Sequence, residues 1–392
     1  MQSAYVLGVG MTPFRSPRSS PNYVELAGIA VREAVRDAGI DYADVEQVFT
    51  AYVYGDSCSG HRAIYGVGMT GIPIFNINSN CSSGASALYL ARQAVASGAV
   101  EIALALGFEQ MPSGAIVEYW KDRPSPLQPH VDVADRRIDD KSMPLAPKLF
   151  GAAGTEYCER YEVGSDMFAA VAVKSRRHAR DNHRAIFREP LSVEQVLSSP
   201  LICSPLTRAQ CCPPTCGAAA AIVVSNLVLR RFGAGRSVRI SGQSLETDLP
   251  SSFAESAMDA VGLGIGRIAA ERAFGEAGIS PGDVDIAELH DCFTVNEVLA
   301  YEALGLCKPG GSKEFIESGD NTYGGRCVTN PSGGLLAKGH PLGATGLAQC
   351  FELVTQLRGE AQARQVEGAV VGVAHNIGLG SSCVVSVYQR TT

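Results

Sequence analysis

The chain carries Ala34-Val-Arg-Asp-Ala-Gly-Ile40 and repeats it as Ala273-Phe-Gly-Glu-Ala-Gly-Ile279, an offset of 239 residues. At the same offset, Asp44-Val45 recurs as Asp283-Val284. Each copy closes an Ala-rich amphipathic segment with a glycine, which is the usual end of a helix. Each then enters an apolar run that is typical of a strand. The repeats indicate an internal duplication.

Two further matches follow in the same order. Gly84-Ala-Ser-Ala-Leu88 matches Gly343-Ala-Thr-Gly-Leu347 at an offset of 259, and Val100-Glu101 matches Val366-Glu367 at an offset of 266. The offset grows by 20 where the second copy carries a Gly-rich extra loop, residues 306–325. Three matches in one order are hard to obtain by chance, so we expect two related halves.

The apolar runs 102–106 and 369–373 are continuous, as in strands that are buried on both faces. They alternate with Ala-rich helices, so each half is expected to be an α/β layer with a largely parallel sheet. Periodicity fades between about residues 111 and 214, which indicates an inserted lobe, and the strand-like run 218–224 then completes the first half. We therefore predict an N-terminal half of residues 1–112 and 213–235, an inserted loop domain of residues 113–212, and a C-terminal half of residues 236–392.

The composition excludes several classes of protein. The 392 residues carry 33 Lys+Arg and 40 Asp+Glu, and this net charge of −7 argues against a general nucleic-acid binder. No apolar run reaches the roughly 18 residues of a membrane span, and the N-terminus has no basic leader. We expect a cytoplasmic protein without a membrane span, whose 12 cysteines are mostly reduced thiols. A cluster of four cysteines lacks paired C-x₂-C spacing, so no zinc site is expected there: Cys203, Cys211, Cys212 and Cys216.

Cys81 is the first candidate for chemistry. It precedes Ser82-Ser83-Gly84 at the start of a predicted helix that stops before Gly98. A thiol at a helix start faces unpaired N–H groups and the positive end of the dipole, which favour the thiolate. The alternative is an inert buried cysteine.

The duplication supplies a partner for this thiol. At the offset of 259, Cys81 aligns with His340 in Lys338-Gly-His-Pro-Leu-Gly. If the halves pack about a pseudo-twofold axis, the two helix starts face each other, and a Cys–His pair makes a nucleophile at neutral pH. The alternative for His340 is a helix-capping or surface histidine.

The segment Glu288-Leu-His-Asp-Cys-Phe293 follows an apolar run, and open α/β sheets place their sites at such strand ends. There, His290 is a candidate donor to a carbonyl oxygen and Cys292 a candidate proton shuttle, unless these are incidental polar residues. Further on, the glycines after Ala374 permit an oxyanion hole of backbone N–H groups. Beside them His375 and Asn376 are possible contacts, and a structural turn is the alternative.

A basic segment stands out against the acidic balance. Residues 174–188 hold six Lys/Arg, and a solvated helix face is the ordinary interpretation. The sharper hypothesis is a patch for the phosphates of an acyl carrier or nucleotide tail. The candidates for this patch are Lys174, Arg176, Arg177, Arg180 and Arg184.

Over essentially its whole length the chain resembles the thiolases, and within them the sterol-carrier-protein type. The specific motifs are His290-Asp-Cys-Phe293, Asn330-Pro-Ser-Gly-Gly and Gly339-His-Pro341. The resemblance implies a duplicated fold of two βαβαβαββ halves in a layered α-β-α-β-α core with an inserted loop domain. It also implies an oligomer, usually a homodimer, with a tetramer as the alternative. Coenzyme A is implied as co-substrate, with no permanently bound cofactor and no metal. We further expect no carrier-protein domain, because the chain stops a few residues after its last apolar run, residues 383–387.

The resemblance also implies roles for the candidates. Cys81 matches the acyl-accepting nucleophile and His340 the histidine that activates it. Where most thiolases have Cys-x-Gly, this chain has Asn376-Ile-Gly378, so the acid/base role points to Cys292. The N–H groups of Cys81 and Gly378 would form one oxyanion hole, and His290 would polarise the thioester oxygen. A second departure is Cys216-Gly-Ala in place of Asp-Gly-Ala.

The expected activity is cleavage of a 3-ketoacyl-CoA by CoA. An acyl-Cys81 intermediate would yield acetyl-CoA or propanoyl-CoA and a shortened acyl-CoA, in fatty-acid or sterol side-chain degradation. The alternatives are a non-catalytic acyl-CoA or lipid-binding protein and an aldolase that cleaves a steroid side chain. Acyl-chain preference and physiological direction are not readable from the sequence.

Overall fold

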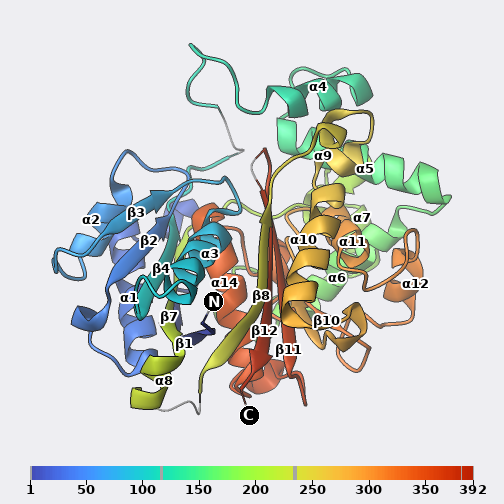
Figure 1. The fold of residues 1–392 in the computed structure, drawn as a ribbon. Coiled ribbons are helices and arrows are strands. Elements are labelled where there is room, and N and C mark those ends of the chain that lie inside the picture. Colours follow the sequence, from blue (N-terminus) through green and yellow to red (C-terminus); the bar gives the residue numbers. More distant parts are fainter. Residues whose placement is uncertain (1, 115–117, 233–235, 381, 392) are drawn as a thin grey trace.

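The computed structural model describes residues 2–114, 118–232, 236–380 and 382–391. Its core is a 10-stranded sheet with the order β10-β9-β11-β12-β8-β1-β7-β4-β2-β3 (Figure 1). The first half supplies β1 (Ala4–Met11), β2 (Gln47–Ala51), β3 (Ile74–Ile77), β4 (Ile102–Glu109) and β7 (Gly217–Ser225). The second half supplies β8 (Val238–Glu246), β9 (Ile286–Glu288), β10 (Val328–Thr329), β11 (Val371–Gly378) and β12 (Ser382–Arg390). Both sets of five have the same spatial order, which confirms the duplication.

Related helices connect the strands in the two halves. The first half has α1 (Tyr23–Ala38), α2 (Ser59–Tyr65) and α3 (Ser83–Ala96), and its last strand is followed by α8 (Asn226–Phe232). The second half has α9 (Ala257–Ala260), α10 (Leu263–Ala277), α11 (Thr294–Ala303), α12 (Ser312–Glu317), α13 (Gly334–Ala337) and α14 (Thr345–Leu357). The duplicated glycines end α1 and α10 as predicted, because Gly39 and Gly278 take left-handed φ values of 68° and 70°.

The expectation of a largely parallel sheet holds for the outer strands of each half and is wrong for the inner ones. β2 pairs in parallel with β3 and β4, but β7 is antiparallel to both β1 and β4. In the second half β12 likewise runs antiparallel to β8 and β11. The physical reason is that β11 ends at Gly378 and β12 begins at Ser382, and so short a connection joins only antiparallel strands. A continuous apolar run indicates that a strand is buried on both faces, but it does not indicate the direction of the strand.

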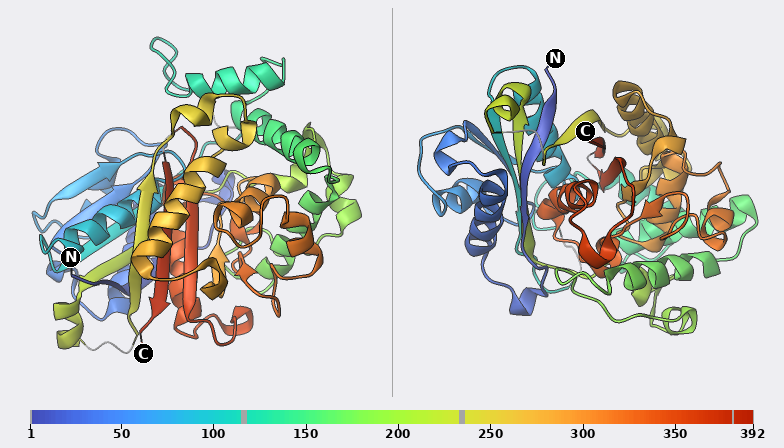
Figure 2. Two further views of the ribbon diagram at one scale, coloured as in Figure 1. Left: turned by 45° about the vertical axis from the view of Figure 1, so that its right-hand side comes forward. Right: turned by 90° about the horizontal axis from the view of Figure 1, so that it is seen from below.

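Three hydrophobic clusters hold the helices and the two parts of the sheet together in five layers, α-β-α-β-α. The central cluster joins Leu88 of α3 and Leu347 of α14 to strand residues of both halves, so these two helices lie inside, between the two parts of the sheet. A second cluster packs α1 and α2 on the outer face of the first half, and a third packs α10 and α11 on the outer face of the second half. The view from below in Figure 2 shows this sequence of layers. The layered α-β-α-β-α core is thereby confirmed.

The inner helices cross where the duplicated glycine motif lies. A Cβ placed on Gly84 would stand 2.6 Å from the carbonyl oxygen of Gly343 and 3.2 Å from the amide nitrogen of Gly346. Any side chain at position 84 would therefore push the two helix starts apart. Because Cys81 and His340 each lie three residues before one of the matched glycines, the crossing brings their segments together.

Residues 113–212 supply most of a helical lobe that packs against the second half (Figure 1). Their described part forms α4 (Gln128–Arg137), α5 (Leu145–Tyr161), α6 (Asp166–Ala179), α7 (Val193–Leu197) and a small sheet of β5 (Leu201–Cys203) and β6 (Leu206–Thr207). A fourth hydrophobic cluster packs Leu149 and Phe168 of this lobe against Met258 of α9 and Val295 of α11. The predicted boundary at residue 235 and the ends at 1 and 392 lie outside the described residues.

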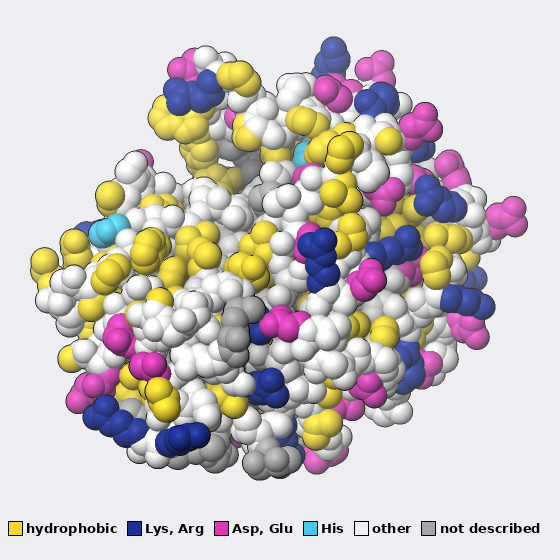
Figure 3. Space-filling view, viewed as in Figure 1, with side chains coloured by type: hydrophobic (Ala, Val, Ile, Leu, Met, Phe, Trp, Pro, Cys, Tyr) yellow, Lys and Arg dark blue, Asp and Glu magenta, His cyan; other side chains and the backbone are white. Residues whose placement is uncertain are grey.

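The surface carries charges of both signs intermingled, without a large basic field on the face that Figure 3 shows. Apolar side chains gather on the side of this face where α2 and the edge strand β3 lie. In these two elements and the segment between them, Tyr65, Met69 and Phe75 are exposed. Among the described helices, none combines the length and the apolar character that a bilayer crossing demands.

Candidate active site

Three sequence-predicted residues from distant segments meet in one buried cluster. The Sγ atom of Cys81 and one ring nitrogen each of His290 and His340 all lie within 4.8 Å of one another. Cys81 lies just before α3, His290 follows β9, and His340 lies in the loop between α13 and α14. The rings of the two histidines are nearly perpendicular, with centroids 5.0 Å apart. The packing of the two halves thus brings the thiol and both imidazoles together.

Hydrogen bonds define the tautomer of His340. The Thr345 hydroxyl donates to the carbonyl oxygen of Pro341 over 2.9 Å, so it acts as acceptor toward Nδ1 of His340, 2.7 Å away. Nδ1 therefore carries the proton, and Nε2 presents a lone pair. Nε2 is buried and has no hydrogen-bond partner among the described residues. This nitrogen is available to accept the proton of a thiol.

The resting charge state differs from the expected thiolate. Burial raises the pKa of Cys81 to about 12, and the carboxylate of Glu109 adds to the rise. Burial also lowers the pKa of His340 to about 3. The cost of desolvating two charges outweighs the helix-start effect on the thiol. Cys81 and His340 therefore rest as a neutral thiol and a neutral imidazole, and proton transfer accompanies nucleophilic attack.

Glu109 ties the two halves together beside the nucleophile. This buried side chain at the end of β4 accepts N–H bonds from Val53 at 3.0 Å, Tyr54 at 2.9 Å and Gly343 at 2.9 Å. Burial raises the pKa of Glu109 to about 7, although these three donors act in the opposite direction. Glu109 was not among the residues predicted from the sequence. Its position at the end of a buried strand, like that of His290, is the signal that would have found it.

Cys292 lies beside the tight cluster and has a thiol neighbour. The N–H of Cys212 donates to the carbonyl oxygen of Cys292 over 2.9 Å, and Cys211 pairs with Phe293 in an antiparallel bridge. Burial raises the pKa of Cys292 well above its usual range, with further contributions from the thiols of Cys212 and Cys81. Cys212 is therefore a third thiol at the site, which its sequence spacing did not reveal because the pairing is formed by tertiary structure.

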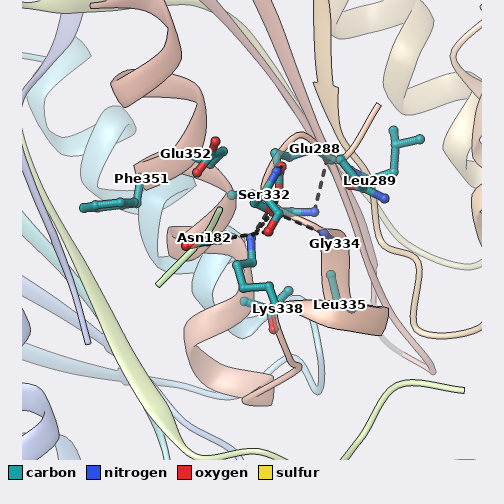
Figure 4. A network of polar contacts seen from close by, with 12 residues as sticks. Asn182, Glu288, Leu289, Ser332, Gly334, Leu335, Lys338, Phe351 and Glu352 are labelled. Atoms are coloured by element: carbon teal, nitrogen blue, oxygen red, sulfur yellow. Dashed lines mark hydrogen bonds and ion pairs between the residues drawn. The ribbon is translucent and has the colours of Figure 1, made fainter. Parts of the chain in front are cut away.

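A buried ion pair connects the segments that carry the two histidines. Lys338 and Glu288 each lie two residues before a histidine of the cluster, and their charged atoms are 3.0 Å apart (Figure 4). Ser332 donates from its backbone and its hydroxyl to Glu288 at 3.0 and 2.7 Å, and accepts from Lys338 at 2.8 Å. Asp291 accepts the N–H of Leu335 at 2.6 Å, next to the start of α13. These contacts position the loop of His290 relative to the loop of His340.

The two tail candidates point to opposite faces of β11. Asn376 donates to Gln349 of α14 over 3.0 Å. His375 faces the other way, where a Cβ on Gly266 of α10 would stand 3.3 Å from its Nε2. Neither residue belongs to the group of three, although His375 is near enough to contribute to the lowered pKa of His290. Gly378, at the end of the strand, precedes Leu379, whose carbonyl oxygen accepts from Asn80 over 2.9 Å, so this turn lies against the Cys81 segment.

The structure removes two residues from the basic patch. Lys174 is buried in an ion pair with Glu297, so it cannot meet a phosphate in solvent. Arg184 binds Glu33 over 2.6 Å. Arg176 is half-buried and lies over the ring of Phe187. The remaining two candidates are Arg177 and Arg180. Together with Arg364 they line a separate cavity of about 410 Å³.

Comparison with known proteins identifies the family of this chain. Residues 4–199 match the description "Thiolase, N-terminal domain", and residues 251–390 match "Thiolase C-terminal domain-like". This chain belongs to the thiolase family. The thiolase is 46% identical over 394 residues to sterol carrier protein 2 of Homo sapiens, covering 99% of this chain and 72% of the relative. It is 33% identical over 410 residues to acetyl-CoA acetyltransferase of Methanothermobacter thermautotrophicus, covering 100% of both. The likeness to such relatives supports an acyltransferase.

Solved structures share the fold of this thiolase. The Ltp2-ChsH2(DUF35) aldolase superimposes with a TM-score of 0.85 at 24% identity, covering 99% of this chain and 98% of that one. Human mitochondrial 3-ketoacyl-CoA thiolase in complex with CoA gives a TM-score of 0.74 at 19% identity, covering 100% and 98%. These likenesses establish the fold, and chemistry rests on the residues of this chain.

Proposed function

We propose that this thiolase cleaves 3-ketoacyl-CoA with CoA through an acyl-Cys81 intermediate. The observation that carries the proposal is the buried cluster of Cys81, His290 and His340, whose ligand atoms lie within 4.8 Å. A nucleophile, a neutral base with a free lone pair and a second imidazole are the groups that acyl transfer needs.

In the first half-reaction, Sγ of Cys81 attacks the 3-keto carbon while Nε2 of His340 accepts the thiol proton. The N–H groups of Cys81 and Gly378 stabilise the oxyanion, and each such donor contributes about 3 kcal/mol. The C2–C3 bond then breaks, which leaves the acyl group on Cys81 and the enolate of acetyl-CoA or propanoyl-CoA. A hydrogen bond from His290 to the thioester oxygen stabilises this enolate, and Cys292 gives its proton to C2.

The second half-reaction restores the enzyme. The Cys292 thiolate takes the proton of the CoA thiol, and the CoA sulfur attacks the acyl-Cys81 thioester. Shortened acyl-CoA leaves, and Cys81 regains its proton from His340. Because Cys81 and Cys292 work as thiols, we place the protein in a reducing compartment such as the cytoplasm, where its 12 cysteines stay free.

Trapping of the acyl group tests this proposal. The protein is incubated with straight-chain, 2-methyl-branched and sterol side-chain 3-ketoacyl-CoAs without free CoA, and its intact mass is measured. We expect one acyl adduct per chain, absent in Cys81→Ala and present in the control Cys58→Ser, which removes an exposed thiol. Binding without an adduct or turnover supports the lipid-binding alternative, and cleavage without an adduct supports the aldolase.

A homodimer completes the proposal. The edge strand β3 has no strand on one side among the described residues, and apolar Phe75 and Met69 are exposed beside it. Unpaired strand edges with apolar neighbours are commonly covered by another chain. Light scattering after gel filtration gives the mass in solution, and a monomer at micromolar concentration would contradict this part of the proposal.

A further inference from the structure

The cluster of Cys81, His290 and His340 also has the composition of a metal site. Thiolate sulfur and imidazole nitrogen are the ligands that zinc prefers in proteins. In the described part of the chain, this is the one group of three such side chains whose ligand atoms all lie within 4.8 Å. All three residues are buried, so water competes weakly for an ion held between them.

A ring nitrogen of each histidine in the cluster lacks a hydrogen-bond partner within the described ranges and could therefore bind a cation. Nε2 of His340 and Nδ1 of His290 are both buried without a hydrogen-bond partner in the described protein. The bond between Nδ1 of His340 and Thr345 leaves the lone pair on Nε2, and metal-binding histidines commonly have their other ring nitrogen hydrogen-bonded in this way. Buried unpaired acceptors cost free energy, which a bound cation would recover.

The distances between the three ligand atoms are close to those of a tetrahedral zinc site. Zinc bonds of roughly 2.3 Å to sulfur and 2.0–2.1 Å to nitrogen place neighbouring ligand atoms roughly 3.4–3.6 Å apart. The three ligand atoms stand within 4.8 Å, so rotation of the side chains has to bring them inward by less than about 1 Å each. A water molecule fits the fourth position, as in other sites with three protein ligands.

We propose that the active-site cluster binds a soft divalent metal ion such as Zn²⁺, and that the bound ion inhibits the thiolase. Binding replaces the thiol proton of Cys81: Zn²⁺ and Cys81–SH give a Zn–S bond and release one H⁺. The ion occupies the sulfur lone pair that attacks the substrate and the Nε2 lone pair that accepts the thiol proton. The side chain of Glu109, which accepts the N–H of Gly343 over 2.9 Å, lies next to this cluster.

The donor set also predicts which ions bind. One sulfur and two nitrogens suit Zn²⁺, Cd²⁺ and Co²⁺, whereas Mg²⁺ and Ca²⁺ require oxygen ligands. Selective binding of the first group therefore distinguishes this site from a general attraction of cations to an acidic protein. The inference does not depend on which acyl compound is cleaved.

Titration of the metal-free full-length protein with Zn²⁺, followed by calorimetry, tests the site without an activity measurement. We expect one ion per chain with release of a proton, and an affinity at least about 100-fold lower in Cys81→Ala and in His340→Gln. Co²⁺ should give the visible absorption of a tetrahedral thiolate site. Alkylation of Cys81 by iodoacetamide, followed by mass spectrometry, should slow when Zn²⁺ is bound.

Cys58→Ser is the matched control, because it removes an exposed thiol outside the cluster and should leave the affinity unchanged. Thermal melting shows that each variant is folded before titration. Equal Zn²⁺ affinity in the wild type and in both cluster variants would overturn the proposal, as would equally tight binding of Mg²⁺ or failure of Zn²⁺ to protect Cys81. Loss of acyl trapping with intact Zn²⁺ binding would instead count only against the proposed function.

Discussion

Gly84→Ala tests whether the crossing of α3 and α14 sets the distance between thiol and base. The new Cβ would stand 2.6 Å from the carbonyl oxygen of Gly343, whereas ordinary contacts begin at 3.4 Å. The two segments must therefore separate by about 0.8 Å, since the obstacle is backbone and cannot rotate away. Gly343 follows His340 by three residues, so this displacement reaches the base directly.

The magnitude follows from that displacement. A misplacement of roughly 1 Å costs about 10²-fold in rate, so kcat for thiolysis should fall by about 10–100-fold. Overpacking at a buried crossing should lower the free energy of unfolding by about 1–3 kcal/mol. KM should change less than kcat, because the displaced contact lies between the segments that carry the thiol and the base.

The assay is steady-state thiolysis of the best 3-ketoacyl-CoA, with urea unfolding of the same samples. Gly275→Ala is the matched control, because no atom lies within 4 Å of its new Cβ on α10. That change should raise stability by about 0.5–1 kcal/mol and leave kcat unchanged. A Gly84→Ala protein with full kcat and full stability would refute the idea that this contact positions the catalytic pair.

Three further changes probe the groups around the cluster. Thr345→Val removes the acceptor that orients His340, so kcat should fall by about 10–100-fold. Thr345→Ser keeps the hydroxyl and should keep most of the activity. Equal kcat values for the two variants would contradict this role of Thr345. Lys338→Met leaves Glu288 charged and unpaired in the interior, which should cost about 3–5 kcal/mol in urea unfolding, and adding Glu288→Gln should restore much of the loss. The pKa of Glu109 is raised from 4.5 to about 7, so the folded state binds the proton of this carboxyl more tightly than the unfolded state does. The contribution of Glu109 to the free energy of unfolding should therefore fall by about 3 kcal/mol as the pH rises from 4.5 to 7. Glu109→Gln should flatten this pH dependence, and an unchanged slope would show that another group causes it.

Much of the fold followed from repeated local patterns. The glycines Gly39 and Gly278 marked two helix ends, and the offset of 259 residues was enough by itself to align Cys81 with His340. Such features succeed because they depend on backbone conformation and on chain order. Strand direction failed for β7 and β12, since an apolar run carries no information about which neighbour a strand joins.

The residues of the site could be predicted from the sequence, whereas their protonation states could not. Helix-dipole reasoning favoured a Cys81 thiolate, but burial depends on what the other half places over the thiol, and its effect is larger. Lys174 looked like a surface cation because its sequence neighbours are basic, while its partner Glu297 is more than a hundred residues away. Cys212 reached the site through a backbone pairing with Cys292 that no local pattern encodes.

Cys81 and His340 occupy equivalent places in the two halves, next to matched glycines that touch across the pseudo-twofold axis. In an ancestor built from two identical half-length chains, each side chain near this axis would have faced its own copy. A thiol opposite a thiol, or an imidazole opposite an imidazole, offers no acid–base pair. Because the two copies lie in one chain, each position can carry its own residue, so that two related halves hold a single asymmetric site.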